Sequence, residues 1–176
     1  CIVLSPICKR FYMFFILFRK NILIKMKILD EPKAIRLKIM DFLSRREHSS
    51  REILNKMSNR VESKEMLLDS IKELIEDGLL SDERFAESYF QSRKNRGYGP
   101  LRIRNELKQK GVGDQIFFTL SNEVNWHKYA LEALRKKING DLPTETKDVL
   151  KLKRFLNYRG FDFQDIDRAF ELLKNE

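Results

Sequence analysis

The chain has 176 residues, of which 42% are apolar and 35% are charged, and its formal net charge at pH 7 is +9. This balance is typical of a folded globular chain with room for a core, and it excludes a disordered or low-complexity protein. The positive charge points to an anionic partner, but residues 1–25 hold five basic and no acidic residues. Net charge alone is therefore a weak argument for nucleic-acid binding.

Residues 1–25 differ from the rest of the chain. The segment begins with Cys1, and its longest apolar run, Phe11 to Phe18, has eight residues. A membrane-spanning helix needs about 20 apolar residues, so we expect no membrane span. The basic pair Lys9-Arg10 also interrupts the apolar core that a signal peptide requires. We treat residues 1–25 as an N-terminal extension ahead of a candidate start at Met26, with an interfacial membrane anchor as the alternative.

Both cysteines, Cys1 and Cys8, lie in this extension. From Met26 onward the chain offers no disulfide framework, no thiolate metal site and no cysteine nucleophile. We therefore expect a cytoplasmic protein that uses no metal and no other cofactor.

The remaining sequence predicts helices throughout, because apolar residues recur at three- and four-residue spacing and no convincing period-two strand occurs. Ser49 and Glu52 predict a capping box, in which hydroxyl and carboxylate satisfy each other's backbone N–H groups. A longer helix from about Ser63 is expected to turn Leu74 and Ile75 inward. The nine expected helices cover approximately residues 28–46, 50–57, 63–77, 81–96, 100–111, the stretch from 114, 123–137, 146–158 and 162–174.

A repeat connects these helices. Leu107 precedes Gly111 by four residues, and 49 residues later Leu156 precedes Gly160 by the same distance. Met57, 50 residues before Leu107, precedes a similar break without the glycine. A period of this length indicates stacked structural units. We predict an all-α fold, an elongated array of three tandem three-helix units. The predicted units span residues 26–80, 81–122 and 123–176.

The second unit holds the most basic part of the chain that is also predicted to fold. From Gln91 to Val112, seven basic residues stand against Glu106 alone. The glycines at 97 and 99 permit a sharp turn and a close approach by a partner, and Pro100 suits the first position of a new helix. The turn between the two helices is therefore a candidate binding surface.

The helix after this turn has two distinguishable faces. On a helical wheel Ile103 and Leu107 define the buried side, while Arg104 and Lys108 form a neighbouring stripe that must reach solvent. Arg102 points elsewhere, toward its i+4 neighbour, in a pair worth a few tenths of a kcal/mol. Arg104 and Lys108 are thus stronger binding candidates than Arg102.

A purely structural interpretation stays open beside the binding one. A basic run near a helix C-terminus is favoured by the helix dipole alone, and such runs commonly form solvated faces. Arg93 continues the apolar line of Phe85 and Tyr89, so it is also compatible with an internal ion pair. Tyr98 is compatible with stacking on a base or with packing on its own helices.

The chain carries in this region, in order, Asp82-Glu83-Arg84-Phe85-Ala86, Gly97-Tyr98-Gly99-Pro100, Ile103, Glu106-Leu107 and Lys110-Gly111-Val112. This order of motifs resembles the RecX family, bacterial regulators of the RecA recombinase. The resemblance extends over residues 30–174, with weaker matches in the first and third units, and the first unit departs from the pattern because its glycine is missing. Residues 1–25 have no counterpart in it. The signature positions are Asp82, Phe85, Ala86, Pro100, Ile103, Leu107 and Gly111.

The resemblance implies a non-enzymatic modulator that lies along the RecA–DNA filament, restrains its growth and reduces its ATPase, strand-exchange and coprotease activities. The implied partners are the RecA filament and single-stranded DNA within it, and the protein is expected to act as a monomer. Contacts with phosphates or with acidic RecA surface are expected from the basic turn and helix. The candidate binding residues are Arg93, Lys94, Arg96, Gly97, Tyr98, Gly99, Arg104, Lys108 and Lys110.

Catalysis finds little support in the sequence. Neither His48 nor His127 has a second histidine or a cysteine at i+3 or i+4, and the chain has no phosphate-binding loop or dinucleotide glycine motif. Two other functions remain as alternatives. The first is a helix-turn-helix DNA-binding regulator that inserts the helix from Pro100 to Lys110 into a groove. The second is an inert helical scaffold.

Overall fold

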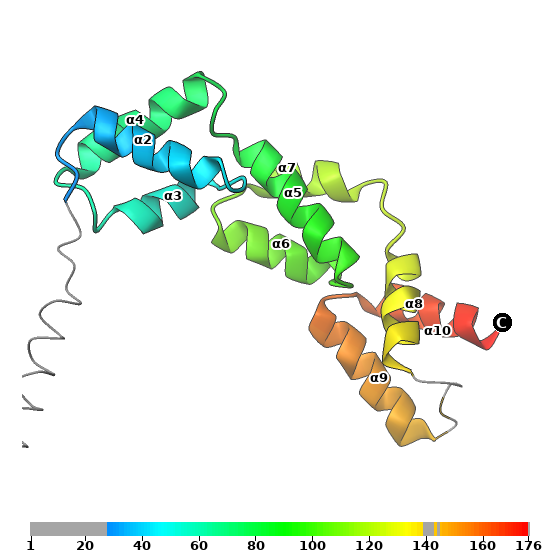
Figure 1. Ribbon diagram of the computed structural model, residues 1–176. Helices are drawn as coiled ribbons and strands as arrows, with labels where there is room; N and C mark the ends of the chain where they lie inside the picture. Colours follow the sequence, from blue (N-terminus) through cyan, green and yellow to red (C-terminus); the bar gives the residue numbers. More distant parts are fainter. Residues whose placement is uncertain (1–27, 139–142, 144, 176) are drawn as a thin grey trace, which may run out of the picture.

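The computed structural model describes residues 28–138, 143 and 145–175, and this part of the chain folds into helices joined by short turns (Figure 1). The extension at 1–25 lies outside the described residues. The described chain has no β-strand beyond an isolated bridge between Leu29 and Val61, so the all-α prediction is confirmed. The helices are α2 (Pro32–Leu43), α3 (Ser50–Met57), α4 (Lys64–Glu76), α5 (Asp82–Asn95), α6 (Pro100–Gln109), α7 (Asp114–Ser121), α8 (Trp126–Lys137), α9 (Thr146–Arg159) and α10 (Phe163–Lys174).

Short polar side chains fix where several helices begin. The hydroxyl of Ser81 accepts the backbone N–H of Arg84 at the start of α5, and Ser49 accepts that of Glu52 at the start of α3. The capping box predicted at Ser49 is only half formed. The Glu52 carboxylate accepts hydrogen bonds from Lys110 and Arg46, because a neighbouring unit brings a cation within reach.

Glycines in the left-handed region terminate the helices that define the repeat. Gly111 has φ 86° and Gly160 has φ 92°. The N–H of the following residue returns to the repeat leucine, over 3.1 Å to the Leu107 carbonyl and 3.2 Å to that of Leu156. This is the Schellman pattern, which needs a residue without a Cβ penalty at positive φ. The 50-residue period thus reflects a repeated helix ending.

The apolar side chains form two cores. Residues of α2, α3 and α4 enclose the first, around Ile39, Ile53 and Leu67, whereas the second and third units share one continuous core. Ile103 and Leu107 are buried as predicted, with 0% and 1% of their surface exposed. The rest of the second core consists of Phe85, Ala86, Phe90, Val112, Phe117, Trp126, Ala130, Leu131, Ala133, Leu134, Leu156, Phe161, Ile166, Ala169 and Phe170.

The prediction that the Ile75 side chain points into the core is wrong. Its side chain is 47% exposed, while Leu74 is fully buried. Adjacent helical residues point about 100° apart, and near the end of α4 the first core has room for only one of the two.

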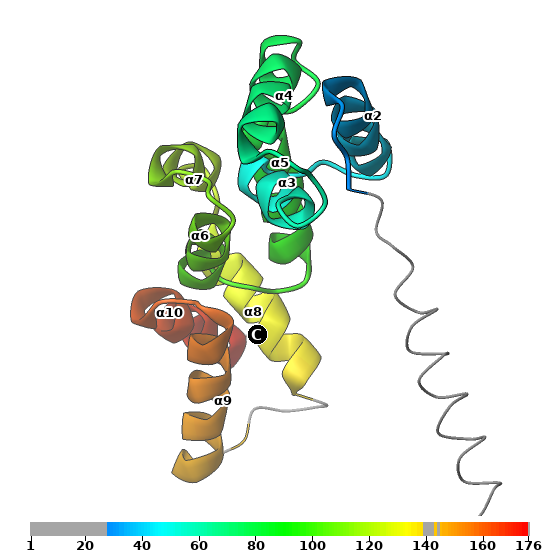
Figure 2. The same ribbon diagram turned by 90° about the vertical axis from the view of Figure 1, so that its left-hand side faces the viewer.

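The units form an elongated array in which α6 and α7 lie between the first and third units (Figures 1 and 2). The second helices of the three units, α3, α6 and α9, are arranged head to tail, so that the start of one meets the end of the second helix in the following unit. The N–H groups of Gly99 and Leu101 at the start of α6 donate to the carbonyls of Arg159 and Gly160 at the end of α9, over 2.8 and 3.0 Å. Likewise the Ser49 hydroxyl at the start of α3 donates to the Lys110 carbonyl at the end of α6, over 2.7 Å.

These head-to-tail joints have a common electrostatic basis. A helix N-terminus carries partial positive charge and unpaired N–H groups, and a C-terminus carries partial negative charge and unpaired carbonyls. Placing an N-terminus against a C-terminus pairs these N–H groups with the carbonyls and brings the opposite partial charges together. Within the described residues, no helix is both long enough and apolar enough to cross a membrane.

Candidate functional site

The turn between α5 and α6 is covered by the third unit. A Cβ added at Gly99 would lie 2.4 Å from the backbone of Gly160 and Phe161, and one added at Gly97 would lie 3.0 Å from the Arg159 guanidinium. The two glycines do allow a close approach, as their positions predict. The approach is made by a segment of the same chain, not by an external partner.

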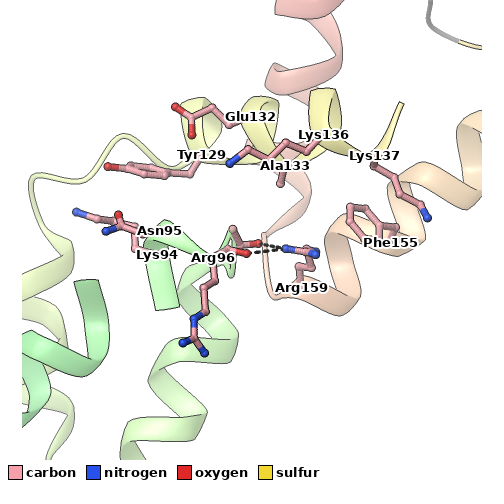
Figure 3. A pocket seen from close by; sticks show the side chains of 11 residues that line it. Lys94, Asn95, Arg96, Tyr129, Glu132, Ala133, Lys136, Lys137, Phe155 and Arg159 are labelled. Carbon is pink, nitrogen blue, oxygen red and sulfur yellow. Dashed lines mark hydrogen bonds between the residues drawn. The ribbon is translucent and has the colours of Figure 1, made fainter. Parts of the chain in front are cut away.

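This docking creates a basic cleft of about 250 Å³ between the turn and helices α8 and α9 (Figure 3). Five cations line it, Lys94 and Arg96 from the second unit and three more from the third, against the single acid Glu132. The remaining members of the basic cleft are Asn95, Gly97, Tyr129, Ala133, Lys136, Lys137, Phe155 and Arg159.

Within the described residues, the cations of the basic cleft form no ion pair with a carboxylate. Lys94 lies 5.3 Å from the ring centre of Tyr129, and Arg159 lies 4.7 Å from that of Phe155. Arg159 also donates to the carbonyl of Arg96 over 2.8 Å, a contact drawn in Figure 3. Aromatic faces and carbonyls orient a cation but do not cancel its charge. The basic cleft therefore keeps a positive potential that suits phosphate or acidic side chains.

Tyr98 is surrounded by guanidinium groups. Those of Arg93, Arg102 and Arg159 lie 5.1, 4.5 and 5.4 Å from its ring centre. Of the two interpretations left open for this ring, the structure shows the packed one. The half-buried Tyr98 thus joins α5, α6 and α9 through contacts within its own chain.

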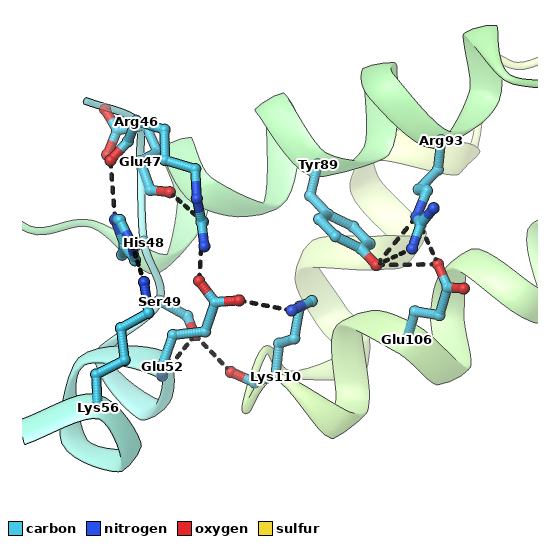
Figure 4. A network of polar contacts seen from close by, with 10 residues as sticks. All are labelled: Arg46, Glu47, His48, Ser49, Glu52, Lys56, Tyr89, Arg93, Glu106 and Lys110. Carbon is cyan, nitrogen blue, oxygen red and sulfur yellow. Dashed lines mark hydrogen bonds and ion pairs between the residues drawn. The ribbon is translucent and has the colours of Figure 1, made fainter. Parts of the chain in front are cut away.

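Arg93 is also engaged within the chain (Figure 4). Its Nε lies 2.8 Å from the Glu106 carboxylate, and it donates to the hydroxyl of Tyr89, which in turn donates to Glu106 over 3.0 Å. Glu106 is further paired with Arg102 over 3.1 Å, as the wheel predicts. This network links α5 to α6, so the internal pairing proposed for Arg93 is confirmed.

Lys110 belongs to the joint between the first two units (Figure 4). Its ammonium donates to Glu52 over 2.6 Å, and Arg46 donates to the other carboxylate oxygen over 2.9 Å. Burial by itself would raise the pKa of Glu52, but the hydrogen bonds from Lys110 and Arg46 hold that pKa below its usual value. Glu52 thus remains ionised at neutral pH and locks the two units together.

Arg104 and Lys108 differ in how much of their charge is available. Arg104 makes a two-pronged contact to Asp114, over 2.7 and 3.0 Å, and lies 5.0 Å from the Phe118 ring centre. The hydrogen bond from Arg104 lowers the pKa of Asp114. Lys108 is exposed and forms no ion pair in the described part of the chain. Lys108 can meet an external anion directly, while Arg104 first has to leave Asp114.

His48 has a structural role. The ring is buried, its Nδ1 lies 2.9 Å from the Arg46 carbonyl and its Nε2 lies 2.8 Å from the Lys56 ammonium. Because the ammonium can only donate, Nε2 accepts and Nδ1 carries the proton. Burial lowers the pKa of His48, which keeps the ring neutral. No three side chains able to hold a metal ion gather anywhere among the described residues.

Known proteins share both the sequence and this fold. A family model described as the second three-helix domain of RecX matches residues 81–116, and one described as the third three-helix domain matches residues 128–170. The "Regulatory protein RecX" of Pseudomonas syringae pv. tomato is 38% identical over 143 residues, which cover 80% of this chain and 92% of the relative. This chain belongs to the RecX family.

Other RecX comparisons agree with this assignment. The "Regulatory protein RecX" of Pseudomonas entomophila is 39% identical over 143 residues, again covering 80% of this chain and 92% of the relative. The crystal structure of RecX from Lactobacillus salivarius superposes with a TM-score of 0.70 at 22% identity, covering 82% of this chain and 97% of the other. A second crystal structure, titled regulatory protein RecX, gives a TM-score of 0.69 at 22% identity over 82% of this chain and 73% of the other. At this identity the two structures establish the fold.

The RecX signature residues occupy positions on which the architecture depends. Asp82 accepts the Ser50 backbone N–H over 2.8 Å, so it caps α3 from the neighbouring unit. Ala86 is fully buried, Pro100 occupies the first turn of α6, and Gly111 adopts positive φ. In this RecX protein the signature therefore describes how the units fold and join.

Sequence reasoning missed the half of the basic cleft that comes from the third unit. Lys136 and Lys137 are visible in the sequence as part of a basic run at the end of α8, and Arg159 precedes the repeat glycine. The sequence gives no sign that these three cations lie close to Lys94, because only the docking of α8 and α9 onto the turn brings them together.

Proposed function

We propose that this protein binds along RecA–DNA filaments, restrains their growth and reduces the ATPase, recombinase and coprotease activities of RecA. The observation that carries the proposal is membership of the RecX family over four-fifths of the chain. We place this activity in the cytoplasm, with the protein acting as a monomer and single-stranded DNA as the nucleic acid inside the filament.

The shape and charge of the molecule support this role. An array of three units offers a long surface that can follow a helical filament. Backbone hydrogen bonds hold the joint between the second and third units, and the half-buried ion pair of Lys110 and Glu52 holds the joint between the first and second. The basic cleft concentrates uncompensated cations at one joint. Such a site attracts phosphate or acidic protein surface and makes binding dependent on salt.

The helix-turn-helix alternative, in which α6 reads a DNA groove, has less support. A recognition helix contacts base edges through its N-terminal residues. Here the N-terminus of α6 is bonded to the end of α9, and Arg102 and Arg104 are paired with Glu106 and Asp114. Insertion into a groove would require the second and third units to separate.

The direct test is RecA-catalysed ATP hydrolysis on single-stranded DNA, titrated with the full chain. We expect inhibition at substoichiometric amounts of this protein. An unchanged ATPase rate at molar excess over RecA would refute the proposal.

A double variant tests whether the basic cleft takes part. Arg96 and Lys136 are exposed, line the basic cleft and form no ion pair within the described residues. We expect Arg96→Glu with Lys136→Glu to raise the amount needed for half-inhibition about tenfold. The matched control, Lys33→Glu with Lys64→Glu, makes the same charge change on exposed positions of the first unit and should leave inhibition unchanged.

A further inference from the structure

A continuous furrow follows the head-to-tail helices α3, α6 and α9. Three hollows of about 500, 480 and 550 Å³ adjoin along it. The first and second share Glu106 and Gln109 as lining residues, and the second and third share Asn157 and Tyr158. We call this feature the second-helix furrow. The three helices together contribute roughly 50 Å of length at 1.5 Å per residue.

The second-helix furrow differs from the basic cleft in place and in lining. On α9 the furrow uses Arg154 and Tyr158, whereas the basic cleft uses Phe155 and Arg159. Phe155 follows Arg154 by one residue, and Arg159 follows Tyr158 by one residue, which turns the cleft residues about 100° around the helix from the furrow residues. The two surfaces therefore lie on adjoining sides of α9. The lining of the furrow has seven basic and three acidic side chains, an excess of four positive charges. Its charged members are Arg51, Lys56, Arg93, Arg102, Lys110, Lys153, Arg154, Glu52, Glu106 and Asp167.

The third-unit end of the furrow exposes two aromatic rings. Tyr158 is 82% exposed and Phe163 is 75% exposed, and both line the same hollow. Of the other large aromatic side chains of the described residues, Phe118 on α7 is 52% exposed, and the rest are more covered, down to 0% for Phe90 and Phe161. Together with Leu150, which is 48% exposed in the same hollow, the two rings form a contiguous apolar patch of the kind that marks a binding site.

Unpaired cations flank these rings. Arg154 lies one turn before Tyr158 on α9 and forms no ion pair in the described part of the chain, and Lys147 lies two turns before Arg154 on the same face. By contrast, Lys153 is paired with Asp167 over 2.7 Å. Arg154 is therefore available to a phosphate next to the two rings, and Lys147 to a phosphate about 10 Å further along α9 toward its start.

We propose that the second-helix furrow binds single-stranded nucleic acid, with bases stacking on Tyr158 and Phe163 and phosphates contacting Arg154 and Lys147. Exposed aromatic rings along a positively charged groove bind any base, because every base has a π face. Amide side chains at Asn105, Gln109 and Asn157 add donors and acceptors along the way.

The same lining argues against a peptide in the furrow. The described residues offer no sheet edge to which an extended peptide could add a strand, and the aliphatic side chains in the lining are few: Leu101, Leu150 and Ile166. An amphipathic helix would find little apolar surface there. Duplex DNA keeps its bases stacked on each other, so the two rings would have no base to cover.

The test uses the full chain and no RecA. Fluorescence anisotropy measures its affinity for a labelled thymidine oligonucleotide, for an abasic oligonucleotide of the same length and for a duplex. We expect the wild type to prefer the single strand over both others. Tyr158→Ala and Phe163→Ala should each weaken thymidine binding about tenfold while leaving abasic binding and the salt slope unchanged.

Two control variants separate stacking from folding. Tyr158→Phe keeps the ring and should bind like the wild type, and Leu68→Ala removes an apolar side chain that is 51% exposed on α4 and should have no effect. Both alanine variants replace exposed rings, and thermal melts followed by circular dichroism should match the wild type. The inference specifies the nucleic-acid side of the proposed function. Its assay omits RecA, so the two can fail separately.

Several outcomes would overturn the proposal. One is unchanged affinity for the thymidine oligonucleotide in a variant that combines Tyr158→Ala with Phe163→Ala. Another is equal affinity of the wild type for the abasic and thymidine oligonucleotides. Absence of single-strand binding by the wild type would overturn it as well. If this double variant kept its oligonucleotide binding but lost inhibition in the separate RecA ATPase assay, the two rings would be assigned to a protein partner instead.

Discussion

The joint between the second and third units depends on the absence of a side chain at Gly99. A Cβ at this position would lie 2.4 Å from the carbonyl carbon and oxygen of Gly160 and from the nitrogen of Phe161, so α6 and α9 would have to move apart. These contacts are backbone atoms that cannot rotate away. The φ of Gly99 is −86°, which alanine adopts freely, so Gly99→Ala tests the contact without backbone strain.

The expected cost follows from what the movement breaks. The hydrogen bonds from Gly99 to the Arg159 carbonyl and from Leu101 to the Gly160 carbonyl, at 2.8 and 3.0 Å, contribute about 1 kcal/mol each. Overpacking adds about 1–3 kcal/mol. We expect Gly99→Ala to lower the free energy of unfolding by roughly 3–5 kcal/mol, measured by urea denaturation followed by circular dichroism.

A second glycine provides the control. Gly113 is the N-cap of α7 with φ −70°, and like Gly99 it makes no side-chain cap. A Cβ added there meets no atom within 4 Å. Gly113→Ala therefore carries the same loss of an N-cap glycine without the steric contact. Equal unfolding free energies for the two variants would show that the joint is not as tight as these distances require.

Two further predictions concern ionisable groups. Glu52→Gln should lower the free energy of unfolding by about 1–2 kcal/mol at pH 7, because it removes the ion pairs with Lys110 and Arg46 at the first joint. The control Glu76→Gln removes an exposed ion pair and should change the free energy of unfolding by less than about 0.5 kcal/mol. The pKa of Glu52 is lowered in the folded state, so this difference should shrink as the pH falls below 4.5 in urea denaturation. Burial and the neighbouring Asp162 raise the pKa of Asp165 to about 6. The protonated carboxyl therefore stabilises the folded state at low pH, and this stabilisation is lost as the pH rises from about 4 to 6. Asp165→Asn should therefore raise the melting temperature at pH 7.5 and have little effect at pH 4, and an equal shift at both values would contradict this reasoning.

The repeated joint explains how a chain with small units forms a stable array. The first unit encloses its own core, but the second and third complete one core between them. Head-to-tail contacts then pair the ends of the second helices, which would otherwise leave backbone groups unsatisfied. The same contacts line up the second-helix furrow, so the surface proposed for nucleic acid is a direct consequence of how the units stack.

The sequence by itself determined the helices, the repeat and the family. Serines and Pro100 start helices, and glycines such as Gly111 end them, through hydrogen bonds within a few residues. Because these bonds are local, their positions can be read along the chain. The signature around Asp82 and Gly111 identified the RecX family for the same reason, since the residues that shape and join each unit are close in sequence.

Only the tertiary structure decided which charges are available. Arg104 meets Asp114 ten residues away, Lys110 meets Glu52 across 58 residues, and Arg159 meets the Gly97 carbonyl across 62. Such pairings depend on how helices and units pack, and a helical wheel does not contain that information. The basic turn that the sequence singled out is therefore partly covered by its own chain, and its cations Lys94 and Arg96 share a cleft with those of the third unit.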